Sequence, residues 1–462
     1  MNKVRFRARQ SAGILLLGLW GCQPVPGTGT PSPIPSSTPS PSPVASPSAT
    51  VTATPEPSLS PQPSSSPSST PTPSPSPSPS ADPSPSPSPE PTATPGLSAL
   101  SFKLIKVIAG KGQVGTPETG IRAETMPFPS SLNALRVDSQ TNLWMLNGAN
   151  GILGYVTPEL VRTTTEQGDI KYRLYWERTK SLDYANDMVL DPDGGFYLVM
   201  PYRNQIVHVA AGGQVTPVAG SGQQGYNGDK SALEAHLNQP AGIARDSFGN
   251  LYISDTGNHL IRKITPDGKL ITLAGQYIQD TKVIDTDNDG ELSDEVPSFV
   301  PVGATSGDNG PAWQARVDSP RHIAVDAAGA VYFSSHAQTI RRIANDRIER
   351  YAGSGQTGYN GSVLRADLAH LNKPAELVFG PDGLLYFVDA GNFRVRRLRS
   401  VAGTLQVEDI AGNGREAELV DALADPLKAE LRPGPMGFDP QGNLYVYDVA
   451  HRRIRMLERN NE

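Results

Sequence analysis

Short apolar runs separated by polar turns follow one another from about residue 130 to the end of the chain. In residues 239–275 the runs are AGIARD, LYISD, LIRKIT and LITLAG. The three turns between them each carry a Gly, Asn or Asp pair, at Gly249-Asn250, Gly257-Asn258 and Asp267-Gly268. Runs of β-branched, aromatic and aliphatic residues with such turns predict a four-stranded antiparallel meander.

The same unit recurs along the chain. Six phrases open a unit, namely LNALRVD, ANDMVLD, AGIARD, RHIAVD, AELVFG and GPMGFD. The second runs, such as LYISD and LYFVD, are apolar on both faces, so a single sheet cannot bury itself. Antiparallel sheets that stack radially on one another close into a propeller. The pattern therefore predicts an all-β, six-bladed β-propeller of four-stranded antiparallel blades.

The best-defined unit also resembles a known family. The stretch NQPAGIARDSFGNLYISDTGNHLIRKI and the linking phrase AGSGQQGYNGDKSALEAHLNQP are similar to NHL repeats. The resemblance covers nearly everything after residue 101. It implies a β-propeller, but it does not imply one activity.

The last unit lacks a fourth run. Its third run, RRIRML, occupies residues 452–457, and no further apolar run follows it. Fourth runs elsewhere often end in Ala-Gly, and so does FKLIKVIAG at residues 102–110, before the first unit. We expect this N-terminal strand to complete the last blade, because strand exchange would remove two exposed sheet edges.

Residues 1–22 are typical of an export signal, with a basic start and the apolar run GILLLGLW at residues 13–20. That run is too short to stay in a bilayer as a helix. The tetrapeptide LWGC resembles a bacterial lipobox, in which the cysteine becomes the lipidated first residue; Trp20 is bulkier than the usual small residue there. Cys22 is the only cysteine. We therefore predict an exported bacterial lipoprotein, anchored to a membrane through Cys22. Gln23, which is not Asp, favours the outer membrane or cell surface.

Residues 23–100 form a Pro/Ser/Thr-rich linker that holds 25 of the 44 prolines and only three charges. Such a composition cannot bury enough apolar surface to order itself, and alternating proline favours an extended chain. At about 3.1 Å per residue, the linker reaches on the order of 200 Å. We expect a disordered stalk between the lipid and the propeller at residues 101–462.

The charge of the propeller limits its partners. The whole chain carries −6, and once the four positive charges of the signal and the three negative charges of the linker are removed, −7 remains on residues 101–462. An acidic domain with no basic tract excludes nucleic acid as the expected partner.

An acidic insertion at residues 276–302 separates two units. Its sequence DTDNDGELSDE resembles a D-x-D-x-D-G calcium loop, with Val296 at the twelfth position in place of the usual Glu. The candidate ligands are Asp285, Asp287, Asp289, Glu291 and Glu295. We expect a structural Ca²⁺ here; the alternative is a solvated acidic loop.

A second candidate site lies at the mouth of the central channel. The position of Gly242 in the third unit is taken by Asp187, His322 and Glu376 in the second, fourth and fifth units. Equivalent inner-strand positions converge on the axis of a propeller, and these side chains suit a divalent metal with a bound water. The remaining members, Ala134 and Pro435, offer no ligand, so the alternative is the polar lining of a wet channel.

Other catalytic motifs are absent from the sequence. It has no G-x-S-x-G elbow, phosphate-cradling loop or H-E-x-x-H pair, and no organic cofactor is expected. These observations favour a monomeric, surface-tethered binding scaffold for a protein or glycan ligand over an enzyme. The alternative is a metal-dependent lyase or hydrolase at the channel mouth, and a third possibility is a cell-wall protein whose stalk is the functional part.

Overall fold

The computed structural model describes residues 99–460, except for 114–122, 124–126, 129–130, 148–151, 162–168, 179–181, 183, 285–293, 302 and 417–421. Contacts divide the chain into two units, Met1–Pro83 and Ser84–Glu462, and every described residue belongs to the second. The predicted signal peptide with Cys22, and nearly all of the predicted linker, lie outside the described residues. Within the described part, no helix is long and apolar enough to cross a membrane.

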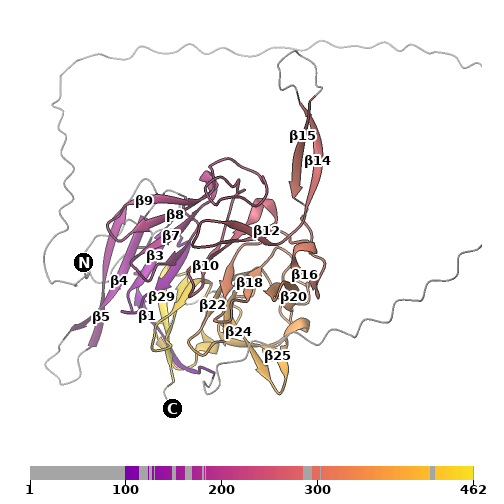
Figure 1. Ribbon diagram of the computed structural model, residues 1–462. Coiled ribbons are helices and arrows are strands. Elements are labelled where there is room, and N and C mark those ends of the chain that lie inside the picture. The colour runs from indigo at the N-terminus through magenta and orange to yellow at the C-terminus, as the bar shows by residue number, and fades with distance from the viewer. Residues whose placement is uncertain are drawn as a thin grey trace, which may run out of the picture. The chain divides into compact units, whose positions relative to one another are not determined.

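The described chain is built of antiparallel sheets (Figure 1). Six sheets have four or five strands, and a separate ribbon has two. The inner strands are Ala134–Val137 (β2), Asp187–Leu190 (β6), Ile243–Arg245 (β10), Ile323–Val325 (β17), Pro374–Phe379 (β22) and Pro433–Phe438 (β27). The second strands are Leu143–Asn147 (β3), Gly195–Met200 (β7), Leu251–Asp255 (β11), Val331–Ser334 (β18), Leu385–Asp389 (β23) and Leu444–Asp448 (β28).

Two further strands complete each sheet. The third strands are Ile152–Val161 (β4), Gln205–Ala210 (β8), Leu260–Ile264 (β12), Ile340–Ala344 (β19), Arg394–Val401 (β24) and Arg453–Arg459 (β29). The fourth strands are Asp169–Arg178 (β5), Val215–Ala219 (β9), Leu270–Ala274 (β13), Arg347–Ala352 (β20), Thr404–Ala411 (β25) and Phe102–Ala109 (β1). The units expected from the sequence are therefore meanders, as predicted.

The N-terminal strand β1 is the fourth strand of the last sheet. It pairs antiparallel with β29, with Ile105 opposite Leu457 and Lys106 opposite Met456. The sheet that contains both ends of the described chain has the order β26-β1-β29-β28-β27. This pairing confirms the expected strand exchange.

Three sheets have one strand more than the four expected. Short strands from the linkers pair with the outer edge of a sheet, namely Gly310–Pro311 (β16), Leu364–Arg365 (β21) and Ala422–Leu423 (β26). A strand of two residues is too short to produce an alternating pattern, so the sequence gives no signal for it. These strands cover backbone groups that would otherwise form an open edge.

Short 3₁₀ turns connect many of the strands. They are Pro201–Arg203 (η4), Thr256–Asn258 (η5), Ala312–Gln314 (η6), Ala366–Leu368 (η7), Ala390–Asn392 (η8) and Pro426–Lys428 (η9). The insertion of residues 276–302 contains the two-stranded ribbon of Tyr277–Ile284 (β14) and Asp294–Pro301 (β15).

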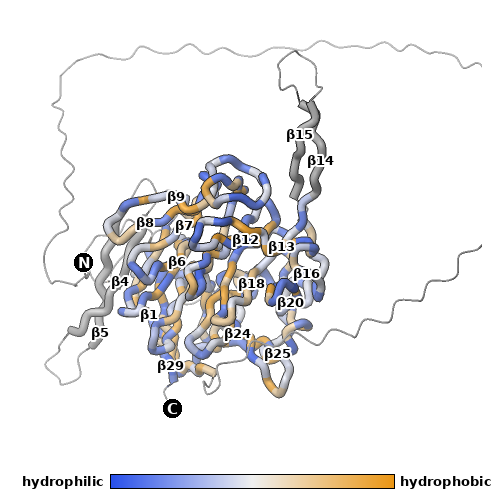
Figure 2. Tube along the Cα trace, viewed as in Figure 1, coloured by the Kyte–Doolittle hydropathy of each residue, from blue (hydrophilic) through white to orange (hydrophobic). Residues whose placement is uncertain are grey.

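The core lies between sheets, because each sheet is apolar on both faces. Buried residues form six clusters, and each cluster draws on two neighbouring sheets. In one of them Tyr332 of β18 packs with Phe387 of β23. Figure 2 shows hydrophobic segments along the strands and hydrophilic segments at many of the turns. The inner strands contact one another in the cyclic order β2, β6, β10, β17, β22, β27 and back to β2. This arrangement is an all-β propeller.

Candidate functional site at the mouth of the channel

Near its start, each inner strand or the residue leading into it provides one position of a common ring. The ring consists of Ala134, Asp187, Gly242, His322, Glu376 and Pro435. Two residues further along, the strands carry small or aliphatic residues, with one exception. That exception is Arg136 in β2, where the other strands have Val189, Ala244, Ala324, Val378 and Gly437.

Arg136 joins the two acidic members of the ring. Its Nη2 donates to Asp187 Oδ1 at 2.6 Å, and its Nη1 donates to Glu376 Oε1 at 2.6 Å. The side chains are nearly enclosed, with 19% of Arg136, 10% of Asp187 and 6% of Glu376 exposed. A planar guanidinium that serves two carboxylates is a strong charge-assisted arrangement. The pair of acids predicted from the sequence is therefore brought together around a cation.

Backbone groups complete this cluster. Arg136 Nε donates to the carbonyl of Met188 at 2.9 Å. Asp187 accepts hydrogen bonds from the amide of Met188 at 2.8 Å and from the amide of Ile243 at 3.0 Å. The cluster thus ties together β2, β6, β10 and β22, which belong to four different sheets.

His322 lies at the edge of the same cluster. Its Nδ1 is 3.8 Å from Glu376 Oε2, beyond hydrogen-bond distance, and 34% of its side chain is exposed. Desolvation, together with the nearby positive charges of Arg136 and Arg321, lowers the pKa of His322 to about 4. The imidazole is therefore neutral at physiological pH.

The two carboxyls respond to burial in the opposite direction. Desolvation raises the pKa of Glu376 to about 7, although Arg136 opposes the shift, and the charge of Asp187 adds to it. Desolvation also raises the pKa of Asp187 against the effect of Arg136. The cluster therefore holds a proton that exchanges near neutral pH, which is a property of groups that perform acid–base chemistry.

The arrangement does not resemble a metal site. Among the described residues, no group of three or more His, Cys, Asp or Glu side chains is placed to hold a metal ion. Asp187, His322 and Glu376 do come together as the sequence predicted, but Arg136 already supplies the positive charge between the two acids. Sequence reasoning missed Arg136; its signal was a lone arginine in a ring of small and aliphatic residues.

The candidate calcium loop can be placed only in part. Asp285, Asp287, Asp289 and Glu291 lie outside the described residues. Glu295 is in β15, where it pairs with Val283 of β14. The calcium site therefore stays a prediction, located at the end of the ribbon where β14 leads into β15.

The other end of the inner strands has a shallow hollow of about 290 Å³. Its lining includes Val137, Phe379 and Phe438, together with Asp138 and Asp439 from the following turns. Both aspartates are occupied, since Asp138 accepts from Asn142 and Trp144 and Asp439 accepts from Asn443 and Tyr445. The carboxylates here hold the turns.

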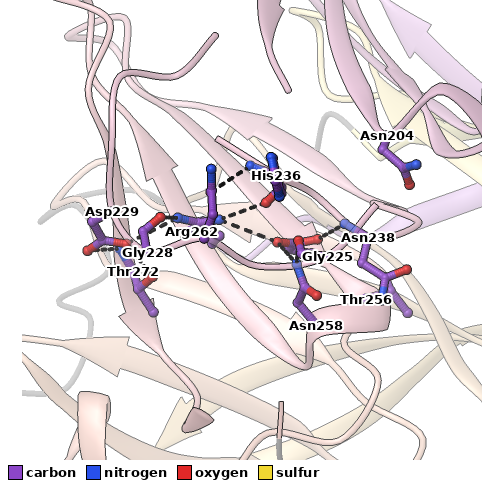
Figure 3. A network of polar contacts seen from close by, with 12 residues as sticks. Asn204, Gly225, Gly228, Asp229, His236, Asn238, Thr256, Asn258, Arg262 and Thr272 are labelled. Carbon is purple, nitrogen blue, oxygen red and sulfur yellow. Dashed lines mark hydrogen bonds and ion pairs between the residues drawn. The ribbon is translucent and has the colours of Figure 1, made fainter. Parts of the chain in front are cut away.

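A second repeated polar network is structural. Arg262 of β12 is fully buried and donates to the carbonyl of Gly228 at 3.1 Å and to Asp229 at 3.1 Å (Figure 3). Asp255 lies 3.6 Å from the same guanidinium and accepts from the amide of Asn238 at 2.8 Å. The network fastens the linker to the sheet, and Asp389 with Arg396 repeats it two sheets further on.

The fold and its repeated networks define a β-propeller, and the comparisons specify the kind. The NHL repeat family matches residues 237–264, so the β-propeller contains an NHL repeat in its third sheet. The match falls on the unit that contains Asp255, Asn258 and Arg262, and Figure 3 labels Asn258 and Arg262 in the network that holds the linker.

Known proteins are similar to this chain over part of their length. The chain is 26% identical over 293 residues to NHL repeat-containing protein 2 of Bos taurus, which covers 60% of this chain and 38% of that protein. It is 25% identical over 267 residues to Teneurin-1 of Homo sapiens, covering 53% of this chain and 9% of that protein. The chain thus spans well under half of these relatives.

A solved structure has the same fold. A protein of unknown function from Bacteroides thetaiotaomicron superposes with a TM-score of 0.51 at 13% identity, covering 77% of this chain and 76% of that one. At this identity the likeness concerns the fold alone.

Proposed function

We propose that this protein is a surface-tethered NHL-repeat propeller that acts as a scaffold for binding a protein or a glycan. The observation that carries the proposal is the Arg136 cluster. Its two carboxyl groups are each held by the same guanidinium at 2.6 Å and are nearly enclosed, so the acidic members of the ring are already engaged in contacts between sheets. A cluster of this kind holds strands in position, and we expect the surrounding loops to provide the binding surface.

The proposed scaffold is a closed ring of six blades with four or five strands each. The six buried clusters, one for each pair of neighbouring sheets, support this number. The contact of β27 with β2 supports closure. A closed ring needs no partner to cover its edges, which supports a monomer.

The proposed tether consists of a lipid on Cys22 and the linker of residues 23–100. Its support is the position of the single cysteine after an apolar run and the proline-rich composition that follows. Fractionation of cells that express the full chain tests it. The protein with Cys22 intact is expected in the membrane fraction, and the Cys22→Ser variant is expected in the soluble fraction. Retention of the variant in the membrane contradicts the tether.

The proposed Ca²⁺ in the loop after β14 is structural. Its support is the spacing of Asp285, Asp287 and Asp289. Calcium titration is expected to raise the melting temperature and to slow proteolysis of the insertion in the full chain. An Asp287→Asn, Asp289→Asn variant is expected to show neither effect, and equal behaviour of the two proteins contradicts the proposal.

The alternative is a lyase or hydrolase at the channel mouth. One observation favours it, namely that the pKa of Glu376 is raised to about 7 beside the partly exposed His322. Metal analysis of the purified full chain and of His322→Ala separates the two functions. A scaffold is expected to contain no metal that depends on His322, whereas a stoichiometric Zn²⁺, Mg²⁺ or Ca²⁺ that is lost in the variant supports the enzyme and contradicts the scaffold.

A further inference from the structure

Two exposed tyrosines lie at the strand ends of the hairpin that carries Asp187. Tyr184 is 57% exposed and Tyr202 is 78% exposed. Their rings meet edge to face, with centroids 5.2 Å apart and an interplanar angle of 72°. Aromatic pairs usually bury their surface, so an exposed pair in a fixed geometry presents two apolar walls to a ligand.

The pair lies at the end of the hairpin that carries Asp187. Tyr184 precedes β6 by three residues, and Tyr202 lies in the 3₁₀ turn η4 that follows β7. In this hairpin Asp187 pairs with Val199, and the amide of Asn186 donates to the carbonyl of Val199 at 2.9 Å. Both tyrosines therefore extend from the strand ends nearest Asp187 and Arg136.

The backbone of Tyr184 is left-handed, with φ of 66°. The same position in the next three sheets is also left-handed, at Gln239 (47°), Ser319 (42°) and Lys373 (55°). The fold thus imposes this conformation on the rim, and glycine or asparagine would meet it with less strain. Tyr184 adopts this conformation at a cost that glycine or asparagine would avoid, which fits a role for its side chain in binding.

The rim offers polar groups around the aromatic walls. Gln239 and Lys373 are exposed, and Ser319 is half-buried. The acids beneath are both paired with Arg136, and only 10% of Asp187 and 6% of Glu376 are exposed, so they form no open anionic surface. Apolar faces surrounded by hydrogen-bonding groups match a sugar ring, whose C–H face is apolar and whose hydroxyls are polar.

We infer that Tyr184 and Tyr202 form a carbohydrate-binding platform at the mouth of the channel. One pyranose ring stacks on a tyrosine face, and its hydroxyls reach the polar rim. The inference rests on the proposed scaffold function and names its ligand class as a neutral glycan.

The test is titration of the detergent-solubilised full chain with cellohexaose, maltohexaose, xylohexaose and chitohexaose by calorimetry. At least one hexaose is expected to bind, and Tyr184→Ala or Tyr202→Ala is expected to weaken it by about tenfold or more. Phe248→Ala is the matched control, because Phe248 is 79% exposed but lies in the turn after β10, at the other end of the inner strands. It is expected to leave binding unchanged.

A second variant separates binding from stability. Tyr184→Gly removes the strained left-handed tyrosine, so it is expected to abolish sugar binding without lowering the melting temperature. Failure of all four hexaoses to bind, or retention of binding in the Tyr184→Ala, Tyr202→Ala double variant, overturns the platform. Capture of a protein ligand without sugar binding also overturns it while leaving the scaffold function standing, whereas a His322-dependent metal contradicts the scaffold itself.

Discussion

One guanidinium connects four sheets at the mouth of the channel. Arg136 donates hydrogen bonds to Asp187 and Glu376, and Asp187 also accepts one from the amide of Ile243. Buried charges are costly unless they are paired and hydrogen-bonded, and here both carboxylates accept hydrogen bonds from the guanidinium of Arg136. The arrangement explains how two acids can lie near the axis of an acidic domain.

Arg136→Met is expected to lower the free energy of unfolding by about 3 kcal/mol, because it leaves two carboxyls buried without their cation. Urea denaturation at pH 8, above the raised pKa of Glu376, measures the effect. Lys103→Met is the control, since Lys103 pairs with Glu458 at the surface with 48% of its side chain exposed. The control is expected to be neutral; an equally small effect of Arg136→Met contradicts the account of the cluster.

His322 is expected to make the protein less stable as the pH falls from 6.5 to 4. Its pKa is lowered from 6.5 to about 4 in the folded state, so across this range the imidazole is protonated in the unfolded chain but not in the folded chain. Protonation therefore favours the unfolded state as the pH falls. Glu376 acts oppositely, because its raised pKa makes stability fall as the pH rises from 4.5 to about 7.

The contribution of His322 is isolated by His322→Asn. The free energy of unfolding of the variant, relative to that of the natural protein, is expected to rise by on the order of 1 kcal/mol between pH 7 and pH 4.5. The difference is kept this small because water screens the partly exposed imidazole. Urea denaturation at the two pH values measures it. A difference between the proteins that does not change with pH would show that His322 titrates normally.

The sequence predicted the members of this cluster better than their chemistry. Asp187, His322 and Glu376 were found because they occupy equivalent repeat positions, and repetition fixes where such positions meet. Arg136 lies in a different ring, and its reach back to the acids depends on a side-chain conformation that periodicity does not encode. A metal was one of two interpretations of these residues, and neither interpretation included the cation that Arg136 supplies.

At the scale of the strands, a buried arginine fastens the linker to its sheet in four of the six units. Arg262, Arg341, Arg396 and Arg455 occupy the same position of β12, β19, β24 and β29, and each is at most 1% exposed. In β8 the equivalent position is occupied by Val207, which cannot make these hydrogen bonds. The arginines bond linker carbonyls, including Gly228, Arg316 and Gly361.

Arg262→Lys is expected to lower the free energy of unfolding by about 2 kcal/mol, because an ammonium cannot serve Gly228, Asp229 and Asp255 with one planar fork. Thermal and urea unfolding measure the change. Lys230→Met, an exposed substitution in the same linker, is expected to be neutral. Retention of full stability by Arg262→Lys would show that charge alone, and not geometry, holds the linker.

Strands that carry an apolar run bounded by turn pairs were predicted well, and elements without these signals were missed. The meander strands carry turn pairs and apolar runs of four or more residues, which are local signals. The edge strands β16, β21 and β26 have two residues each and depend on an existing sheet edge. The insertion was predicted from its acidic loop. The charge pattern gave no signal for the pairing of β14 with β15 on either side of that loop.

At the scale of the whole molecule, the fold depends on a contact between the first and last described strands. The pairing of β1 with β29 closes the last sheet, and the cluster between this sheet and the first contains Ile108, Leu135 and Tyr447. The position of every inner strand, and hence of Arg136 and the tyrosine platform, follows from this closure.

Oxidative cross-linking across that pairing tests the closure most directly. Lys106 and Met456 are direct partners, so a Lys106→Cys, Met456→Cys variant of the full chain, with Cys22→Ser, places two thiols within disulfide distance. It is expected to oxidise rapidly to a species of altered mobility in non-reducing gels, whereas the displaced pair Lys106→Cys, Glu458→Cys is expected to remain reduced. Cross-linking of the displaced pair in preference, or of neither, would contradict the closed ring and every site placed by it.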